Sequence, residues 1–120
     1  MKLFSLGCRA RRVIVAVLTG SAPLLGATEA FADDSAQLAL GKKLFTQGAM
    51  PACAICHTLR DAGAEGAVGP ILDELKPDAA RVATALRNGL GNMPSYKATL
   101  SEEQILALAR YVARASGASK

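Results

Sequence analysis

Apolar residues recur at helical spacing in three segments of the chain, and no segment shows the two-residue alternation of a half-buried strand. The first segment covers residues 36–48, where Leu38, Gly41 and Phe45 share one face and lysines occupy another. A glycine inside a helix costs about 1 kcal/mol relative to alanine. Gly41 is therefore either merely tolerated or kept because another helix crosses closely at this position.

The second predicted helix begins after a proline at Asp78, a residue type that caps helix starts, and ends at Gly89. Val82, Leu86 and Leu90 lie on its inner side.

A third helix is predicted over residues 102–116, because Ser101 and Gln104 form a capping box and Gly117 follows the last apolar residue. Its expected inner face consists of Ile105, Leu108, Tyr111 and Val112. Residues 58–69 are rich in Gly and Ala and have no lasting period, so they are expected to form a loop. The predicted fold class is all-α.

The first 32 residues have the pattern of a secretory signal peptide rather than of a folded domain. A basic start is followed by an apolar run and then by Ala30-Phe31-Ala32, which resembles an Ala-x-Ala cleavage site. The run is too short for a membrane span. We expect cleavage after residue 32, a single domain over residues 33–120 in the periplasm, and no stable membrane insertion afterwards. A retained N-terminal anchor is the alternative.

Removal of this leader changes what the charge implies. The leader holds four basic residues and one acidic residue, so the net charge falls from +4 to +1 without it. The basic balance of the whole chain therefore gives no reason to expect nucleic acid as a partner. Only three aromatic residues remain, Phe45, Tyr96 and Tyr111, which is little for a core of this size. A bound apolar cofactor would supply the missing volume.

The chain contains the sequence Cys53-Ala54-Ile55-Cys56-His57, which fits the Cys-x-x-Cys-His attachment pattern of a c-type haem. The two cysteines can add to the two vinyl groups of one haem as thioethers, and the histidine that follows can offer a nitrogen to the iron. Neither cysteine would then be available for a disulfide bond.

The Cys-x-x-Cys-His pattern has three other interpretations. A thioredoxin-like redox pair belongs to a βαβ unit, and no strand pattern precedes Cys53. A zinc site needs four ligands, whereas beyond residue 32 the chain offers only Cys53, Cys56 and His57 as soft ligands. A chance match to a short motif is the third.

A methionine paired with histidine on haem iron raises the reduction potential, and Met93 is the candidate for this role. It lies in a stretch punctuated by glycine and proline, 36 residues beyond His57. Met50 precedes Cys53 by three residues, and each residue spans at most about 3.6 Å, so its tether is too short to pass around the ring.

An iron-bound imidazole usually donates its other N–H to an acceptor that orients the ring. The carbonyl of Pro70 could accept this hydrogen bond from His57. The alternative for Pro70 is a proline that only stiffens the loop.

With these residues placed, the chain resembles the class I, monohaem cytochromes c of small bacterial periplasmic type over nearly all of residues 36–117. Three motifs follow one another in the family order, and both terminal helices match the family. These matches are the 53–58 motif, Val68-Gly69-Pro70, Asn92-Met93-Pro94, Gly41 with Phe45, and Leu108 with Tyr111.

The resemblance implies a small cytochrome c fold of three to five helices around one covalently attached haem c. It implies that the terminal helices cross at Gly41 with Phe45 against Tyr111, that Pro70 accepts the His57 N–H, and that Met93 is the distal iron ligand. The segment before Cys53 is longer than in mitochondrial-type members, and that between Pro70 and Met93 is short. Residues 57–96 also resemble acceptor cytochromes of periplasmic sulfite dehydrogenases.

The expected function is one-electron transfer rather than enzymatic catalysis, since His57 is the only histidine and no nucleophile is paired with a base. We expect a monomer with transient redox protein partners: a periplasmic dehydrogenase as donor, and an oxidase or another cytochrome as acceptor. Two alternatives stay open. One is a haem enzyme or gas-binding protein with a displaced Met93, and the other is a tightly bound cytochrome subunit of a dehydrogenase.

Overall fold

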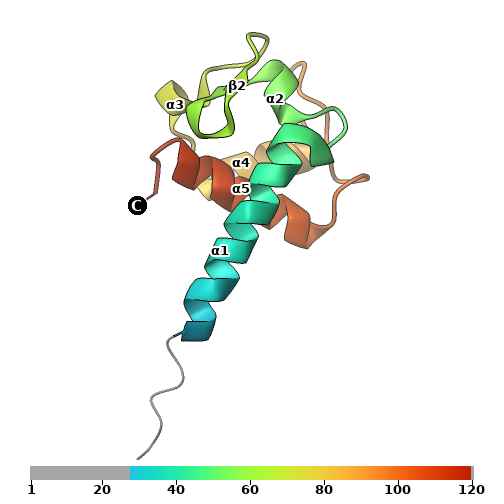
Figure 1. Cartoon of the computed structure of the whole chain (residues 1–120). Helices are drawn as coiled ribbons and strands as arrows, with labels where there is room; N and C mark the ends of the chain where they lie inside the picture. The colour runs from blue at the N-terminus through green and yellow to red at the C-terminus, as the bar shows by residue number, and fades with distance from the viewer. Residues whose placement is uncertain (1–27, 120) are drawn as a thin grey trace, which may run out of the picture.

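The computed structural model describes residues 28–119, so most of the predicted leader, residues 1–27 of 1–32, lies outside them. Within this range the chain forms five α-helices, one π-helical turn, one 3₁₀ turn and one small hairpin (Figure 1). In chain order the elements are α1 (Thr28–Lys43), the π-turn η1 (Leu44–Gly48), α2 (Cys53–Cys56), β1 (Thr58–Leu59), the 3₁₀ turn η2 (Arg60–Ala62), β2 (Ala64–Glu65), α3 (Leu72–Leu75), α4 (Ala79–Asn88) and α5 (Glu102–Ala115).

The fold is organised around the crossing of α1 and α5, which lie against each other although they are far apart in sequence (Figure 1). A Cβ atom at Gly41 would lie 2.4 Å from both the carbonyl oxygen of Ala107 and the Cβ of Tyr111. One turn further on, the rings of Phe45 and Tyr111 meet edge to face with centroids 6.1 Å apart. The predicted crossing at Gly41 is thereby confirmed.

Helix α1 begins earlier than predicted. The sequence pattern predicts a start near residue 36, but the helix runs without a break from Thr28. The prediction assumed a chain already cut after residue 32. In the uncut chain no glycine or proline interrupts residues 28–40, and Asp33 accepts a hydrogen bond from Gln37 at 3.3 Å, one turn along the same helix.

The starts of α4 and α5 are capped as the sequence predicted. The carboxylate of Asp78 accepts the backbone N–H of Arg81 at 2.7 Å. At α5 the hydroxyl of Ser101 accepts the N–H of Gln104 at 3.2 Å, while the Gln104 side chain accepts the Ser101 N–H at 2.9 Å. Leu90 departs from the prediction, because α4 ends at Asn88 and this leucine is 71% exposed.

Residues 58–69 are not entirely loop. Thr58 pairs with Glu65 and Leu59 with Ala64 in an antiparallel hairpin, and Gly63 takes a left-handed φ of 62° next to its turn. Strands of two residues are too short to show a period in the sequence. Helix α3 was not predicted either, because its four residues are also too few to show a period.

A network of polar contacts ties this hairpin to the crossing helices. Asp61, between the two strands, accepts hydrogen bonds from the Tyr111 hydroxyl at 2.7 Å and from the Lys42 ammonium at 3.1 Å. Both contacts lower the pKa of the Asp61 carboxyl, the hydroxyl most. The pKa of Tyr111 is raised, chiefly by burial and also by this carboxylate.

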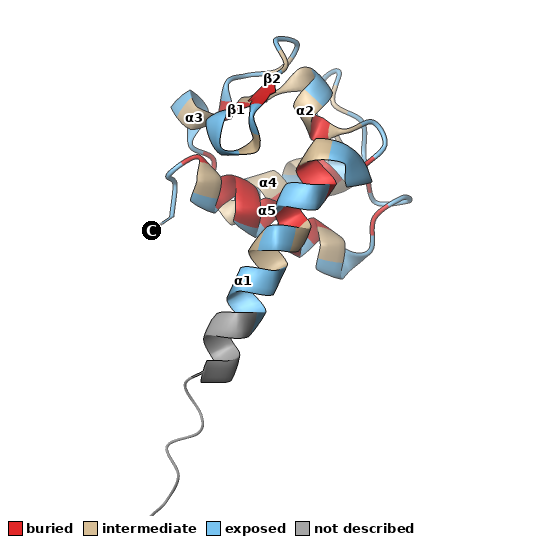
Figure 2. Ribbon diagram, in the orientation of Figure 1, coloured by how far each residue is buried: buried red, intermediate tan, exposed pale blue. Residues whose placement is uncertain are grey.

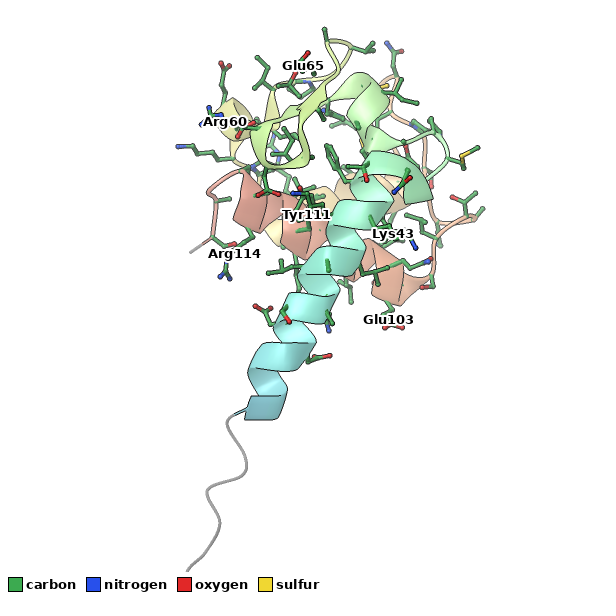
Figure 3. All side chains as sticks on the ribbon, in the orientation of Figure 1. Lys43, Arg60, Glu65, Glu103, Tyr111 and Arg114 are labelled. Carbon is green, nitrogen blue, oxygen red and sulfur yellow. The ribbon has the colours of Figure 1, made fainter. Side chains whose placement is uncertain are left out.

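The core follows the inner side of α5 and the elements packed on it (Figure 2). Its largest fully buried side chains are Phe45, Leu59, Leu86, Ile105 and Leu108. Figure 3 shows Tyr111 at the helix crossing, while Glu103 and Arg114 on the same helix point away from it. No helix within residues 28–119 is long and apolar enough to cross a membrane.

Replacing Gly41 with Ala should destabilise the protein, although helix propensity alone favours alanine by about 1 kcal/mol. The added methyl group must push α1 and α5 apart, and overpacking of this kind costs about 1–3 kcal/mol. Denaturant unfolding of the haem-loaded protein measures the change. Ala39→Gly, at an exposed position of the same helix, calibrates the propensity contribution. A Gly41→Ala protein more stable than the parent would contradict the close crossing.

Candidate haem site

One large cavity, of about 770 Å³, lies between the segment that carries the two cysteines and helices α4 and α5. Its walls are mainly apolar, and its size lies within the range of small-molecule and cofactor sites. Helix α5 contributes Leu108 and Val112, and α4 contributes Val82 and Leu86. Cys53, Cys56, His57, Pro70 and Met93, the five site residues predicted from sequence, all line this cavity.

The two cysteines are held by the single turn of α2. The N–H of His57 donates to the carbonyl of Cys53 at 2.9 Å and closes this turn. No disulfide joins the two cysteines, and burial raises the pKa of the unmodified Cys53 thiol to about 11.

The His57 ring is oriented by the chain that follows the hairpin. Its Nδ1 lies 3.0 Å from the carbonyl oxygen of Pro70, which has no hydrogen to give, so Nδ1–H donates this hydrogen bond, and in the neutral imidazole Nε2 is the nitrogen with a free lone pair. Gly69 packs against the ring so closely that a Cβ there would lie 2.4 Å from Cε1 of His57. The Pro70 carbonyl thus sets which ring nitrogen carries the hydrogen, and Gly69 sets how closely the chain approaches the ring.

Met93 lies in the loop between α4 and α5. Leu90 and Met93 exchange backbone hydrogen bonds of 3.0 Å, which close a tight turn around Gly91. Gly89, with φ of 75°, allows this turn, because a Cβ there would lie 2.9 Å from the Met93 carbonyl oxygen. Met50 is 78% exposed and is not among the residues that line the cavity.

Three residues support the site in ways that the sequence did not predict. Gly66 lets the chain pass close to the end of α2, since a Cβ there would lie 2.6 Å from the backbone nitrogen of His57. Gly69 leaves room for the His57 ring, as described above. The Tyr96 hydroxyl donates to the carbonyl of Pro51 at 2.8 Å and links the Met93 loop to the segment before Cys53. The glycines carried a signal, because several within one short loop suggest close backbone approach as well as turns.

The alternative interpretations of the cysteine motif find no support in the described region. Over residues 28–119, no group of three or more His, Cys, Asp and Glu side chains gathers where it could hold a metal ion such as zinc. The sheet there is a two-stranded antiparallel hairpin that follows the cysteines, not the βαβ unit of a thioredoxin-like pair.

The residues present fit a haem. Two thiols, one imidazole with a free nitrogen and one thioether line a single apolar cavity, which is the donor set that a covalently attached haem requires. Together with the helical fold, this site defines a monohaem c-type cytochrome.

The chain belongs to the family described as "Cytochrome C oxidase, cbb3-type, subunit III", whose model it matches over residues 36–112. Among solved structures it is similar to the c-type cytochrome SorU from Sinorhizobium meliloti, with 53% sequence identity and a TM-score of 0.67. That match covers 69% of this chain and 94% of SorU. No curated protein sequence matches the chain. The protein is thus a haem-based electron carrier with one covalently bound haem c, and the small cytochrome c fold expected from the sequence is confirmed.

Replacing Gly69 with Ala should lower the amount of haem that the protein carries, because the new methyl group would occupy the position of the His57 ring. The haem content is measured from the ratio of haem to protein absorbance and from the mass of the denatured chain. Gly63→Ala adds a methyl group in the same segment with nothing within 4 Å, so it should load haem normally despite its strained φ. Equal haem loading of the Gly69→Ala protein and the parent would contradict this account of the His57 position.

Proposed function

We propose that this protein is a periplasmic one-electron carrier whose haem iron is held by His57 and Met93. One observation carries the proposal: Met93 lines the same cavity as the cysteines and His57, whereas the other methionine beyond the leader, Met50, is exposed outside it. Histidine with methionine is a ligand set that raises the reduction potential of a haem.

Each residue has a distinct part in this proposal. Cys53 and Cys56 would hold the cofactor by thioether bonds, and the Pro70 carbonyl, by accepting the Nδ1–H, would leave Nε2 of His57 to bind the iron. Met93 would supply the other protein ligand to the iron, which would leave no coordination position for a substrate. The bound haem supplies a one-electron change at its iron, and the apolar walls limit the access of water.

The arrangement favours a carrier over an enzyme. Apart from His57, no histidine is available as a general base, and the Nδ1 of His57 is engaged with Pro70. A gas-binding protein or haem enzyme would need a distal position that a ligand can enter, which a fixed Met93 closes.

The proposed electron donor is a periplasmic dehydrogenase, and the acceptor is a terminal oxidase or another cytochrome. The resemblance of residues 57–96 to acceptor cytochromes of sulfite dehydrogenases favours a sulfite dehydrogenase as the donor, and the similarity to the c-type cytochrome SorU is consistent with a carrier. A monomer that binds its partners transiently fits this role. A cytochrome subunit tightly bound to its dehydrogenase shares the chemistry but would co-purify with the enzyme.

Replacing Met93 with Ala should remove the weak sulfur-to-iron charge-transfer band of the oxidised protein, lower its reduction potential, and let the reduced protein bind carbon monoxide. All three follow if the Met93 sulfur is an iron ligand. Absorption spectroscopy and a redox titration of the haem-loaded protein measure them.

Met50→Ala is the matched control, since it removes the same side chain from an exposed position and should change none of these readouts. If the unaltered reduced protein already binds carbon monoxide readily, the distal site is open and the gas-binding or enzyme interpretation replaces the carrier.

The periplasmic location rests on the leader, most of which lies outside the described residues. Sequencing the N-terminus of the protein recovered from the periplasm should find Asp33 as the first residue, because Ala30-Phe31-Ala32 matches a signal cleavage site. An intact or lipid-modified N-terminus would instead indicate a membrane anchor.

A further inference from the structure

The haem cavity is almost free of charged side chains. Among the described residues that line it, Arg81 is the only one that carries a formal charge at neutral pH, apart from the titratable imidazole of His57. No acidic residue lines the cavity. Arg81 is therefore the one described side chain in this wall whose permanent positive charge could attract an anionic part of a bound molecule.

Arg81 is well placed to meet a ligand at the edge of this cavity. It lies in the first turn of α4, where its backbone N–H is fixed by the Asp78 carboxylate at 2.7 Å. The residue is exposed although it lines the cavity, which places it at the rim. Thr84 and Ala85, one turn further along α4, line the cavity as well, so this face of the helix is directed at the cofactor.

The guanidinium of Arg81 forms no ion pair with any acidic side chain of the described region. Arg87, on the same helix, is paired with Glu102 and is not part of the cavity wall. The Thr84 hydroxyl, one turn further along α4, already donates its hydrogen to the Ala80 carbonyl at 2.9 Å, so it has none left to donate to a ligand.

We propose that Arg81 binds a propionate of the haem, with its guanidinium N–H groups donating to the carboxylate oxygens at the rim of the cavity. A haem carries two propionates, which are ionised at neutral pH, and a planar guanidinium matches a carboxylate with two parallel hydrogen bonds. Arg81 would then be a cofactor-binding residue that contacts the edge of the haem carrying the propionates. Its positive charge also stabilises the reduced state of the iron relative to the oxidised state, whose charge is greater.

The test compares three haem-loaded variants with the parent by redox titration and by the propionate bending band in the resonance Raman spectrum. Arg81→Gln should lower the reduction potential and shift the propionate band. Arg81→Lys keeps the positive charge but cannot donate two parallel hydrogen bonds to a carboxylate. Its reduction potential should therefore stay near that of the parent while the propionate band shifts. Arg87→Gln removes the same charge from the same helix outside the cavity and should leave both readouts unchanged.

An Arg81→Gln protein with the potential and the propionate band of the parent would overturn the assignment, as would an Arg81→Lys protein with an unshifted band. Either result leaves the electron-carrier function standing, because that function depends on the iron ligands and not on Arg81. Conversely, loss of the Met93 ligand would be seen in the charge-transfer band, which Arg81 variants should not alter.

Discussion

The close contact of α1 and α5 at Gly41 is the constraint on which the rest of this structure depends. Because no side chain separates the backbones there, Phe45 reaches Tyr111 one turn later and η1 turns the chain toward Cys53. The adjacent face of the same α5 supplies Leu108 and Val112 to the cavity wall. The distance between the two helices therefore fixes where the attachment motif stands relative to the wall that the cofactor must pack against.

The cavity also explains how so small a chain can build a domain. Only Phe45, Tyr96 and Tyr111 are aromatic beyond the leader, and apolar residues of α4 and α5 line the cavity as well as the core. A haem bound there contributes apolar contact that the protein lacks, so its binding energy adds to the stability of the fold. Folding and cofactor attachment are thus expected to support each other.

The sequence predicts those parts of the fold that depend on neighbouring residues along the chain, such as helix caps and the helical spacing of apolar residues. The helical period, the Ser101 capping box and the Asp78 cap identified α4 and α5, and the mid-helix Gly41 indicated the crossing. The hairpin and α3 were missed because two to four residues carry no period, and the start of α1 was missed because it depends on whether the leader is present.

Part of the site could also be predicted, since covalent attachment demands a fixed spacing of Cys53, Cys56 and His57. The contributions of Gly66, Gly69 and Arg81 could not be predicted, because each depends on which part of the folded chain lies next to that residue. A glycine in a loop looks the same whether it faces solvent or an imidazole ring, and an arginine on a helix looks the same whether it faces water or a cavity.

The hydrogen bond from Tyr96 to the Pro51 carbonyl has a consequence for the speed of electron exchange. It joins two segments 45 residues apart, one leading into the cysteines and the other following Met93. The backbone N–H of Tyr96 also donates to the Leu86 carbonyl at 2.7 Å, which anchors the same residue to α4. The segment before Cys53, the segment after Met93 and helix α4 are therefore linked by hydrogen bonds within the protein, and not only through the cofactor. A framework that moves little when the charge at its centre changes keeps the reorganisation energy low, and a low reorganisation energy permits rapid transfer at a small driving force.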